Sequence, residues 1–302
     1  MPHMLPVVHV GFHKCGSTTL QGALFDRHPQ VANLGEPREN ENALRATRNV
    51  LESCHQNPRK RAPFDPDRGR ALWREALATV PPGKVPVFSK ETLTLSEFYT
   101  EPGDERLPTR LHAVVGPARI VIVVRHQISL IESLYLYQAK GARYEAIDQW
   151  LKSRDGALRL YRYNTVADSF AACFGRENVG VFLFEDMKSD AAGFARQVCN
   201  FIGVDAEQGA LLIRGERRNK RVSQRFLVYS KLRKALGMYI PFGRMVPEAA
   251  RQAFNDFISA GSEARVRLPA GWITELERYF RDDNRRLARE RGLPLEKYRY
   301  PL

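Results

Sequence analysis

Short runs of apolar residues rich in β-branched side chains alternate along the chain with segments in which apolar residues recur at helical spacing. Helical spacing is clear at Leu20, Ala23 and Leu24 and again at Ile128 and Ile131, which predicts helices that begin near residues 17 and 127. The apolar runs lie at residues 6–11, 85–89, 119–124 and 179–184. Because these runs are nearly continuous in hydrophobicity and alternate with helices, they predict an α/β fold with a central parallel sheet flanked by helices.

The strand pattern stops near residue 205, and helical patterns continue from there to a last one at residues 272–291. With 302 residues the chain is long enough to bury one large core. We therefore predict a single domain over residues 1–302. Within it we expect an α/β core over residues 1–205, and a basic loop and helical cap over residues 206–302 that does not fold independently.

The segment VVHVGFHKCGSTTL at residues 7–20 joins a buried strand, a tight loop and the start of an amphipathic helix. Backbone N–H groups and the macrodipole at a helix N-terminus attract anions, and Gly16 allows a phosphate to approach closely. Lys14 adds a full positive charge, and Ser17, Thr18 and Thr19 add hydroxyl donors. The segment therefore predicts a phosphate-binding loop, with a turn that only caps a helix as the alternative.

The spacing of this loop differs from that of a P-loop nucleotide triphosphatase. The GxxxxGK[ST] motif places its lysine directly before the hydroxyl residue that holds magnesium, whereas Lys14 precedes Gly16. The strand at residues 119–124 is followed by Arg125, where a magnesium-binding aspartate would be expected. We therefore expect a phosphate site that is built from protein cations and needs no metal.

Arg125 follows a buried strand and is expected at the carboxyl edge of the sheet, where ligands of parallel α/β proteins bind. Ser133 lies eight residues further on, which is about two helical turns, so its hydroxyl can lie on the same side as Arg125. A forked guanidinium and a hydroxyl suit a terminal phosphate. Taken alone, Arg125 also suits a surface ion pair, and Ser133 a hydroxyl bonded to its own helix.

The two motifs together resemble those of the sulfotransferases that use 3′-phosphoadenosine 5′-phosphosulfate (PAPS). HKCGSTTLQ at residues 13–21 is similar to the 5′-phosphosulfate-binding loop of bacterial members, which read HKTGTTSLQ, with Cys15 in place of the usual Thr. Arg125 and Ser133 match the arginine and serine that bind the 3′-phosphate in this family. The resemblance covers most of residues 5–225. It implies the P-loop nucleotide-kinase-like sulfotransferase fold, and transfer of a sulfuryl group from PAPS to an acceptor hydroxyl or amine.

Two further segments carry the same resemblance. VFLFEDMK at residues 181–188 is similar to the strand and YEDM element of the family, which puts Phe184 in the place of an adenine-contacting tyrosine. RRNKRVS at residues 217–223 resembles the basic RxNxS loop that closes over the nucleotide, with a solvated basic surface as the alternative. The nucleotide-binding residues that the resemblance implies are His13, Lys14, Cys15, Gly16, Ser17, Thr18, Thr19, Arg125, Ser133, Phe184, Arg218, Asn219 and Ser223.

Sulfuryl transfer needs an in-line acceptor, a base for its proton and cations for the leaving phosphate. Lys14 is the candidate for stabilising the bridging oxygen and the leaving group. Glu91 is a candidate base because it follows the run at residues 85–89, where family members place a catalytic His or a Lys/Glu pair. Glu36 is a second candidate because some bacterial members have a catalytic Glu at a similar place, and His13 is a third. A carboxylate base needs burial or a hydrogen-bonding acceptor to raise its pKa.

The composition indicates which classes of partner the protein binds, but it does not identify the acceptor. The formal net charge is +13, with 47 Lys and Arg against 34 Asp and Glu, which favours anionic partners. No zinc-finger or RNA-recognition signature is present, so we expect no nucleic-acid partner. The four cysteines are widely separated, and no apolar stretch is long enough for a signal peptide or a membrane span. We expect a soluble, cytoplasmic protein; peripheral contact with a membrane and the oligomeric state stay open.

Two other functions are compatible with an anion-binding loop. A nucleotide-dependent kinase would require magnesium and an acidic metal ligand, and a non-catalytic protein of the same fold would bind nucleotide or polyanion without consuming it. The leading prediction is a PAPS-dependent sulfotransferase that uses in-line displacement and no metal. Its expected acceptor is a carbohydrate, a glycolipid or a small metabolite, and the sequence does not decide among them.

Overall fold

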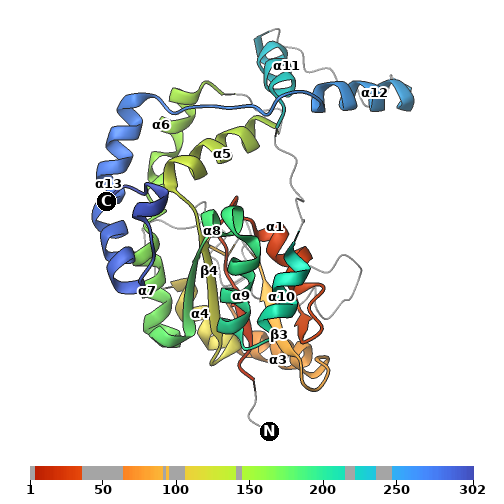
Figure 1. Cartoon of the computed structure of the whole chain (residues 1–302), viewed down its shortest axis with the longest axis vertical. Coiled ribbons are helices and arrows are strands. Elements are labelled where there is room, and N and C mark those ends of the chain that lie inside the picture. The colour runs from red at the N-terminus through yellow and green to blue at the C-terminus, as the bar shows by residue number, and fades with distance from the viewer. Residues whose placement is uncertain are drawn as a thin grey trace. The chain divides into compact units, whose positions relative to one another are not determined.

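The chain forms two compact units (Figure 1). The first comprises Met1–His126, Gly156–Arg218 and Glu277–Leu302, and the second comprises Gln127–Asp155 and Asn219–Leu276. These units are not the segments 1–205 and 206–302 into which we divided the predicted domain, because the residues after 276 return to the first unit. The single domain over residues 1–302 stays a prediction. The computed structural model describes residues 4–35, 64–90, 93–94, 106–140, 145–214, 222–235 and 247–302.

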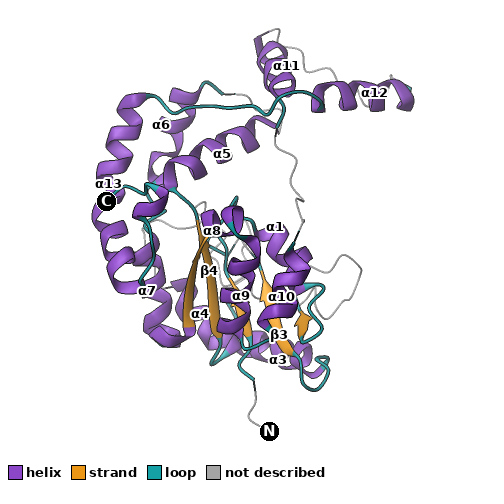
Figure 2. Ribbon diagram, viewed as in Figure 1, coloured by secondary structure: helices purple, strands orange, loops and turns teal. Residues whose placement is uncertain are grey.

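A parallel sheet forms the centre of the first unit, with helices on both faces (Figure 2). The strand order is β2-β3-β1-β4-β5, and every neighbouring pair is parallel. This arrangement confirms the predicted α/β fold with a central parallel sheet. The strands are β1 (Val7–His9), β2 (Val31–Asn33), β3 (Val85–Ser89), β4 (Arg119–Val124) and β5 (Val179–Leu183).

The structure differs from the predicted strands in three places, the first of which is β1, limited to residues 7–9 of the predicted run 6–11. It adds β2, whose three residues are too few for a periodic pattern to reveal. It also ends β5 at Leu183, so Phe184 is the first residue of helix α8 (Phe184–Ser189) instead of the last residue of a strand. Glu185 and Asp186 lie in the first turn of α8, where negative charge stabilises a helix.

Helices of the first unit pack against the sheet through apolar faces. On α9 (Ala191–Ile202) the buried residues include Phe194, Val198 and Ile202, which recur at helical spacing, and α9 contacts both β5 and α10. The other elements of this unit are α1 (Ser17–Thr19), η1 (Leu20–Phe25), α3 (Pro66–Ala78), α4 (Arg106–Val115), α7 (Tyr163–Phe174), η3 (Arg176–Asn178), α10 (Ala206–Ile213) and η4 (Glu296–Tyr298).

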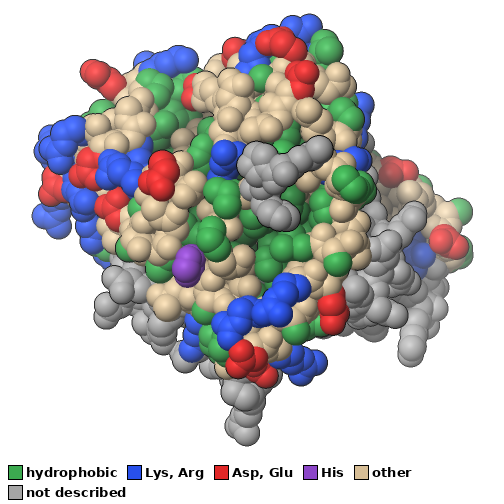
Figure 3. Space-filling model, turned by 90° about the horizontal axis from the view of Figure 1, so that it is seen from below, with side chains coloured by type: hydrophobic (Ala, Val, Ile, Leu, Met, Phe, Trp, Pro, Cys, Tyr) green, Lys and Arg blue, Asp and Glu red, His purple; other side chains and the backbone are tan. Residues whose placement is uncertain are grey.

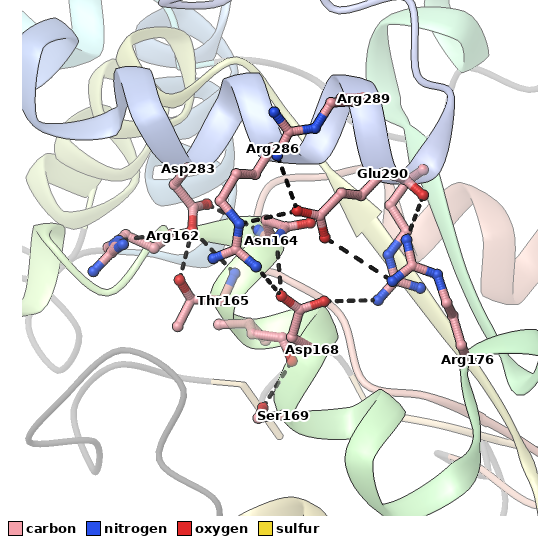
Figure 4. Close-up of polar contacts among 12 residues, drawn as sticks. Arg162, Asn164, Thr165, Asp168, Ser169, Arg176, Asp283, Arg286, Arg289 and Glu290 are labelled. Atoms are coloured by element: carbon pink, nitrogen blue, oxygen red, sulfur yellow. Dashed lines mark hydrogen bonds and ion pairs between the residues drawn. The ribbon is translucent and has the colours of Figure 1, made fainter.

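A buried carboxylate connects α7 to helix α13 (Ala270–Arg291), whose residues from 277 belong to the first unit (Figure 4). Asp283 is 1% exposed. It accepts hydrogen bonds from the backbone N–H groups of Asn164 (2.9 Å) and Thr165 (3.0 Å) and from the Thr165 hydroxyl (2.6 Å). Asp283 therefore caps the N-terminus of α7, whose first N–H groups have no partner within the helix.

We expect Asp283→Ala to lower the free energy of unfolding by about 2–3 kcal/mol, because it leaves buried donors without an acceptor. Asp283→Asn keeps one side-chain oxygen and is the matched control, for which we expect a loss of about 1 kcal/mol. Urea denaturation of the two variants and the wild-type protein measures both values. An Asp283→Ala protein as stable as the wild type would show that the cap contributes nothing.

The second unit is built from helices and contains a small core of its own. Its elements are α5 (Gln127–Lys140), most of α6 (Ile147–Leu158), α11 (Gln224–Ala235), α12 (Glu248–Ser259) and the first residues of α13. Leu227 on α11 and Ala264 are buried and pack with Leu136 of α5. Glu132 of α5 accepts a hydrogen bond from the N–H of Leu268 (3.2 Å), which connects α5 to the segment after α12.

The distribution of charged side chains on the surface and the length and hydrophobicity of the helices bear on which partners the protein can bind. The face drawn in Figure 3 carries Lys and Arg side chains in several separate groups, some of them beside Asp and Glu. Such a distribution does not by itself define a nucleic-acid surface. Within the described part of the chain, none of the helices is both long enough and apolar enough to span a bilayer.

Candidate functional site

The order of the strands puts a topological switch point at the carboxyl ends of β1 and β4. From β1 the chain builds β2 and β3 on one side, and then returns to build β4 and β5 on the other side. At such a switch point the connections leave in opposite directions, and ligands of parallel α/β proteins bind there. The loop after β1 and Arg125 after β4 both lie at this edge, as the sequence predicted.

Two residues of the loop have left-handed backbone conformations. Gly16 has a φ of 86°, and a Cβ at this position would lie 2.7 Å from Met187 Sδ and 3.1 Å from Phe184 Cδ2. Glycine is therefore required both for the backbone conformation and for the close approach of α8. Lys14 has a φ of 62°, which costs a non-glycine residue on the order of 1 kcal/mol or more. The surrounding fold holds the lysine in this conformation.

The helix that begins after Gly16 has an N-terminus without a side-chain cap. The Gly16 carbonyl accepts from the N–H of Thr19 (3.0 Å) and of Leu20 (3.1 Å), so the helical bonds begin there. The first N–H groups of a helix have no partner within it and attract anions. The hydroxyl of Ser17 is directed elsewhere, since Ser17 is buried and donates to the Phe12 carbonyl (3.4 Å).

Arg125 contacts both the loop and α8. Its Nη1 donates to the Lys14 carbonyl (3.0 Å), and its guanidinium lies over the ring of Phe184, 4.9 Å from the centroid. The ammonium of Lys188 lies 6.0 Å from the same ring. The structure thus brings together Lys14, Gly16, Arg125 and Phe184, which the sequence assigned to one nucleotide site.

Buried residues behind the loop fix its backbone. Cys15 is fully buried and donates from its thiol to the His13 carbonyl (3.4 Å). Burial raises the pKa of the Cys15 thiol well above its ordinary value, and the charge of Arg125 only partly offsets this. The thiol therefore stays protonated and is a poor nucleophile. Tyr163 donates to the Arg125 carbonyl (2.6 Å), and burial raises its pKa too, so it remains a donor.

A second buried cluster supports the loop from the β3 side, and sequence reasoning missed it. Ser89 Oγ lies 2.7 Å from His9 Nδ1 and accepts from Gln21 Nε2 (3.0 Å). These contacts join β1, β3 and η1. The only sequence signal was the presence of polar residues in apolar segments, which does not say how they pair.

Other residues of the predicted site lie in the second unit or outside the described residues. Ser133 lies on α5 and is half-buried. Ser223 precedes α11, donates from its hydroxyl to the Ile258 carbonyl and accepts from the N–H of Phe226 (3.1 Å), so it acts as a helix cap. The roles of both serines toward a nucleotide stay predictions. Outside the described residues lie Glu36, Glu91, Arg218 and Asn219.

His13, Thr18 and Thr19 complete the loop. His13 and Thr19 are half-buried and Thr18 is exposed, so the three side chains are accessible to different degrees. Their roles in binding the nucleotide stay predictions.

Comparisons with known proteins concern both the sequence and the fold of this chain. A model of the sulfotransferase family matches residues 6–208, which is more than half of the chain. The crystal structure of a sulfotransferase from Alicyclobacillus acidocaldarius has a TM-score of 0.60 to this structure at 16% sequence identity, covering 97% of this chain and 98% of that chain. A mouse sulfotransferase, SULT7A1, complexed with PAP has a TM-score of 0.44 at 15% identity, covering 84% and 82%. No curated protein sequence matches.

Proposed function

The chain belongs to the sulfotransferase family, and from this premise we propose that it transfers the sulfuryl group of PAPS to a hydroxyl or amine of an acceptor. The observation that supports this best is the convergence of Lys14, Arg125 and Phe184 at the carboxyl edge of the sheet, beside an uncapped helix N-terminus. An uncapped helix start and two cations suit a nucleotide with two phosphate-bearing positions.

The residues of the loop at 13–19 bind the 5′-phosphosulfate in this proposal. The backbone N–H groups that begin the helix face the anion, and Lys14 supplies the positive charge. Arg125 binds the 3′-phosphate, a role that the resemblance also assigns to Ser133, and Phe184 provides a ring face for the adenine. The resemblance also assigns Arg218, Asn219 and Ser223 to the nucleotide site.

The chemical step breaks the bond from sulfur to the bridging oxygen of PAPS and forms a new bond from sulfur to the acceptor atom. The acceptor oxygen or nitrogen forms a bond to sulfur while the bond from sulfur to the bridging oxygen of PAPS breaks, and adenosine 3′,5′-bisphosphate (PAP) leaves. Lys14 stabilises the negative charge that develops on the bridging oxygen. The acceptor proton passes to a base, for which Glu91, Glu36 and His13 are the candidates.

The chemistry of the acceptor is proposed more broadly. A carbohydrate, a glycolipid or a small metabolite that carries a hydroxyl or amine fits the reaction. The step as proposed needs only protein groups and the two substrates, and it uses no metal.

Calorimetric titration with PAP in the presence of EDTA tests the donor site. We expect PAP to bind without magnesium and more tightly than adenosine 5′-monophosphate (AMP), because only PAP carries a 3′-phosphate for Arg125. Transfer of radioactive sulfate from PAPS to a panel of acceptors, also in EDTA, then tests turnover. Binding of ATP only with magnesium, and none of PAP, would contradict the proposal and favour a kinase. PAP binding without any sulfuryl transfer would favour a non-catalytic binding protein.

A further inference from the structure

The segment at residues 296–302 packs against the start of α8, within the first unit. Tyr300 donates from its hydroxyl to Glu185 Oε2 (2.9 Å), and Tyr298 donates to Asp186. Tyr300 is 3% exposed, and the Pro301 carbonyl accepts from Asn284 Nδ2 (3.0 Å). Two tyrosines thus bind the two acidic residues that directly follow Phe184.

Glu185 continues this contact to the residue beside Arg125. Its other oxygen, Oε1, accepts from the backbone N–H of His126 (3.0 Å). One carboxylate therefore holds the Tyr300 hydroxyl and the peptide group between Arg125 and His126. Because a carboxylate oxygen accepts stronger hydrogen bonds than a neutral group does, this bridge restrains that peptide.

His126 makes two more contacts with the same segment. Its ring lies 5.3 Å from that of Tyr300, edge to face, and its Nε2 donates to the Arg299 carbonyl (2.9 Å). Arg299 has a left-handed backbone conformation, with a φ of 57°. The segment 296–302 therefore makes three contacts with His126. Tyr300 packs against the His126 ring and reaches the His126 backbone N–H through Glu185, and the Arg299 carbonyl accepts from the His126 side chain.

The Arg125 peptide is held from its other side as well. Tyr163 donates to the Arg125 carbonyl (2.6 Å), so both polar groups of the peptide between Arg125 and His126 are bonded to side chains. The two tyrosine hydroxyls can donate to these acceptors only while they are protonated. Burial raises the pKa of Tyr300 well above its ordinary value, and the nearby charge of Glu185 acts in the same direction. The Tyr300 hydroxyl therefore stays protonated and remains a donor to Glu185.

We propose that Tyr300, acting through Glu185 and the backbone of His126, is a positioning residue that fixes Arg125 for the 3′-phosphate of the nucleotide. This inference rests on the proposed role of Arg125. Tyr300 contacts neither phosphate. Its effect is on the orientation of the guanidinium relative to Phe184 and the phosphate loop, since a fixed side chain loses less conformational entropy when it binds.

The experiment compares Tyr300→Phe with the wild type by calorimetric titration with PAP and with AMP. We expect the Kd for PAP to rise about threefold to tenfold, while the Kd for AMP changes by less than about twofold. A merely structural role would weaken both ligands alike. Tyr298→Phe is the matched control, because it removes a hydroxyl from the same segment without touching Glu185, and we expect it to leave the ratio of the two Kd values unchanged.

A double-mutant cycle with Glu185→Gln tests whether Tyr300 acts through Glu185. If Tyr300 acts through Glu185, Tyr300→Phe has a smaller effect on the Kd for PAP in the Glu185→Gln background than in the wild type. A Tyr300→Phe protein that keeps the wild-type preference for PAP would overturn the inference and leave the donor site intact. Equal effects of Tyr298→Phe and Tyr300→Phe would also overturn it. A wild-type protein that binds AMP as tightly as PAP would contradict the role of Arg125 itself.

Discussion

Lys14→Met is expected to lower kcat for sulfuryl transfer by about 10²- to 10³-fold, which is the effect of removing one donor that stabilises charge in a transition state. The Kd for PAP is expected to change much less. The substitution keeps a long, unbranched side chain, so the left-handed backbone conformation of residue 14 carries a similar penalty before and after. The Lys14 carbonyl also remains available to Arg125. The variant therefore tests the ammonium group alone.

Steady-state transfer from radioactive PAPS, with an acceptor found by screening, measures kcat of the variant and of the wild type. Lys84→Met serves as the matched control, because Lys84 precedes β3 at the amino end of the sheet, opposite the carboxyl edge. We expect it to retain the wild-type rate. A Lys14→Met protein whose rate lies within tenfold of the wild type would mean that another group stabilises the leaving phosphate.

The phosphate loop could be predicted from the sequence because its information is local. Strand, glycine and helix start follow one another within residues 7–20, and each has a physical signature of its own. Arg125 could be predicted for the same reason, since it directly follows a run of apolar residues. The phosphate loop and Arg125 both lie where the sequence predicted them, at the carboxyl ends of the neighbouring strands β1 and β4.

The groups that hold these residues in place could not be predicted, because they are distant in the sequence. Tyr300 and Glu185 are 115 positions apart, and His9 and Ser89 are 80 apart. Periodicity and motif spacing describe neighbours along the chain, whereas such pairs form only when the whole unit folds. The missing strand β2 has a related cause, since three residues carry almost no periodicity.

The general base could not be predicted from the sequence, for a different reason. Glu91 follows the predicted strand at residues 85–89 and Glu36 lies in the loop after the first predicted helix, and the family resemblance supports both, so the sequence does not separate them. What distinguishes a base from an ordinary loop carboxylate is burial and a hydrogen-bonded acceptor. Neither property can be read from the identity of the residue. A structure of the complex with the acceptor would therefore be needed to choose between Glu36 and Glu91.

Arg125→Ala is expected to raise the Kd for PAP by about 10²- to 10³-fold, because it removes the charge-assisted, forked hydrogen bonds proposed for the 3′-phosphate. It also removes the bond to the Lys14 carbonyl and the contact with the Phe184 ring. Those losses affect the loop that binds the 5′-phosphate, so we expect the Kd for AMP to rise as well, by about tenfold or less. The ratio of the two values isolates the 3′-phosphate.

Arg125→Lys separates charge from geometry in the same titration. A lysine keeps the positive charge, but it lacks the planar fork that binds two phosphate oxygens at once and lies flat on an aromatic ring. We therefore expect a Kd for PAP between those of the wild type and of Arg125→Ala. If Arg125→Ala weakened PAP and AMP by the same factor, the arginine would act only by supporting the loop, and the 3′-phosphate would have to bind elsewhere. If Arg125→Lys matched the wild type, charge alone would be sufficient, and the precise placement of the guanidinium would not matter.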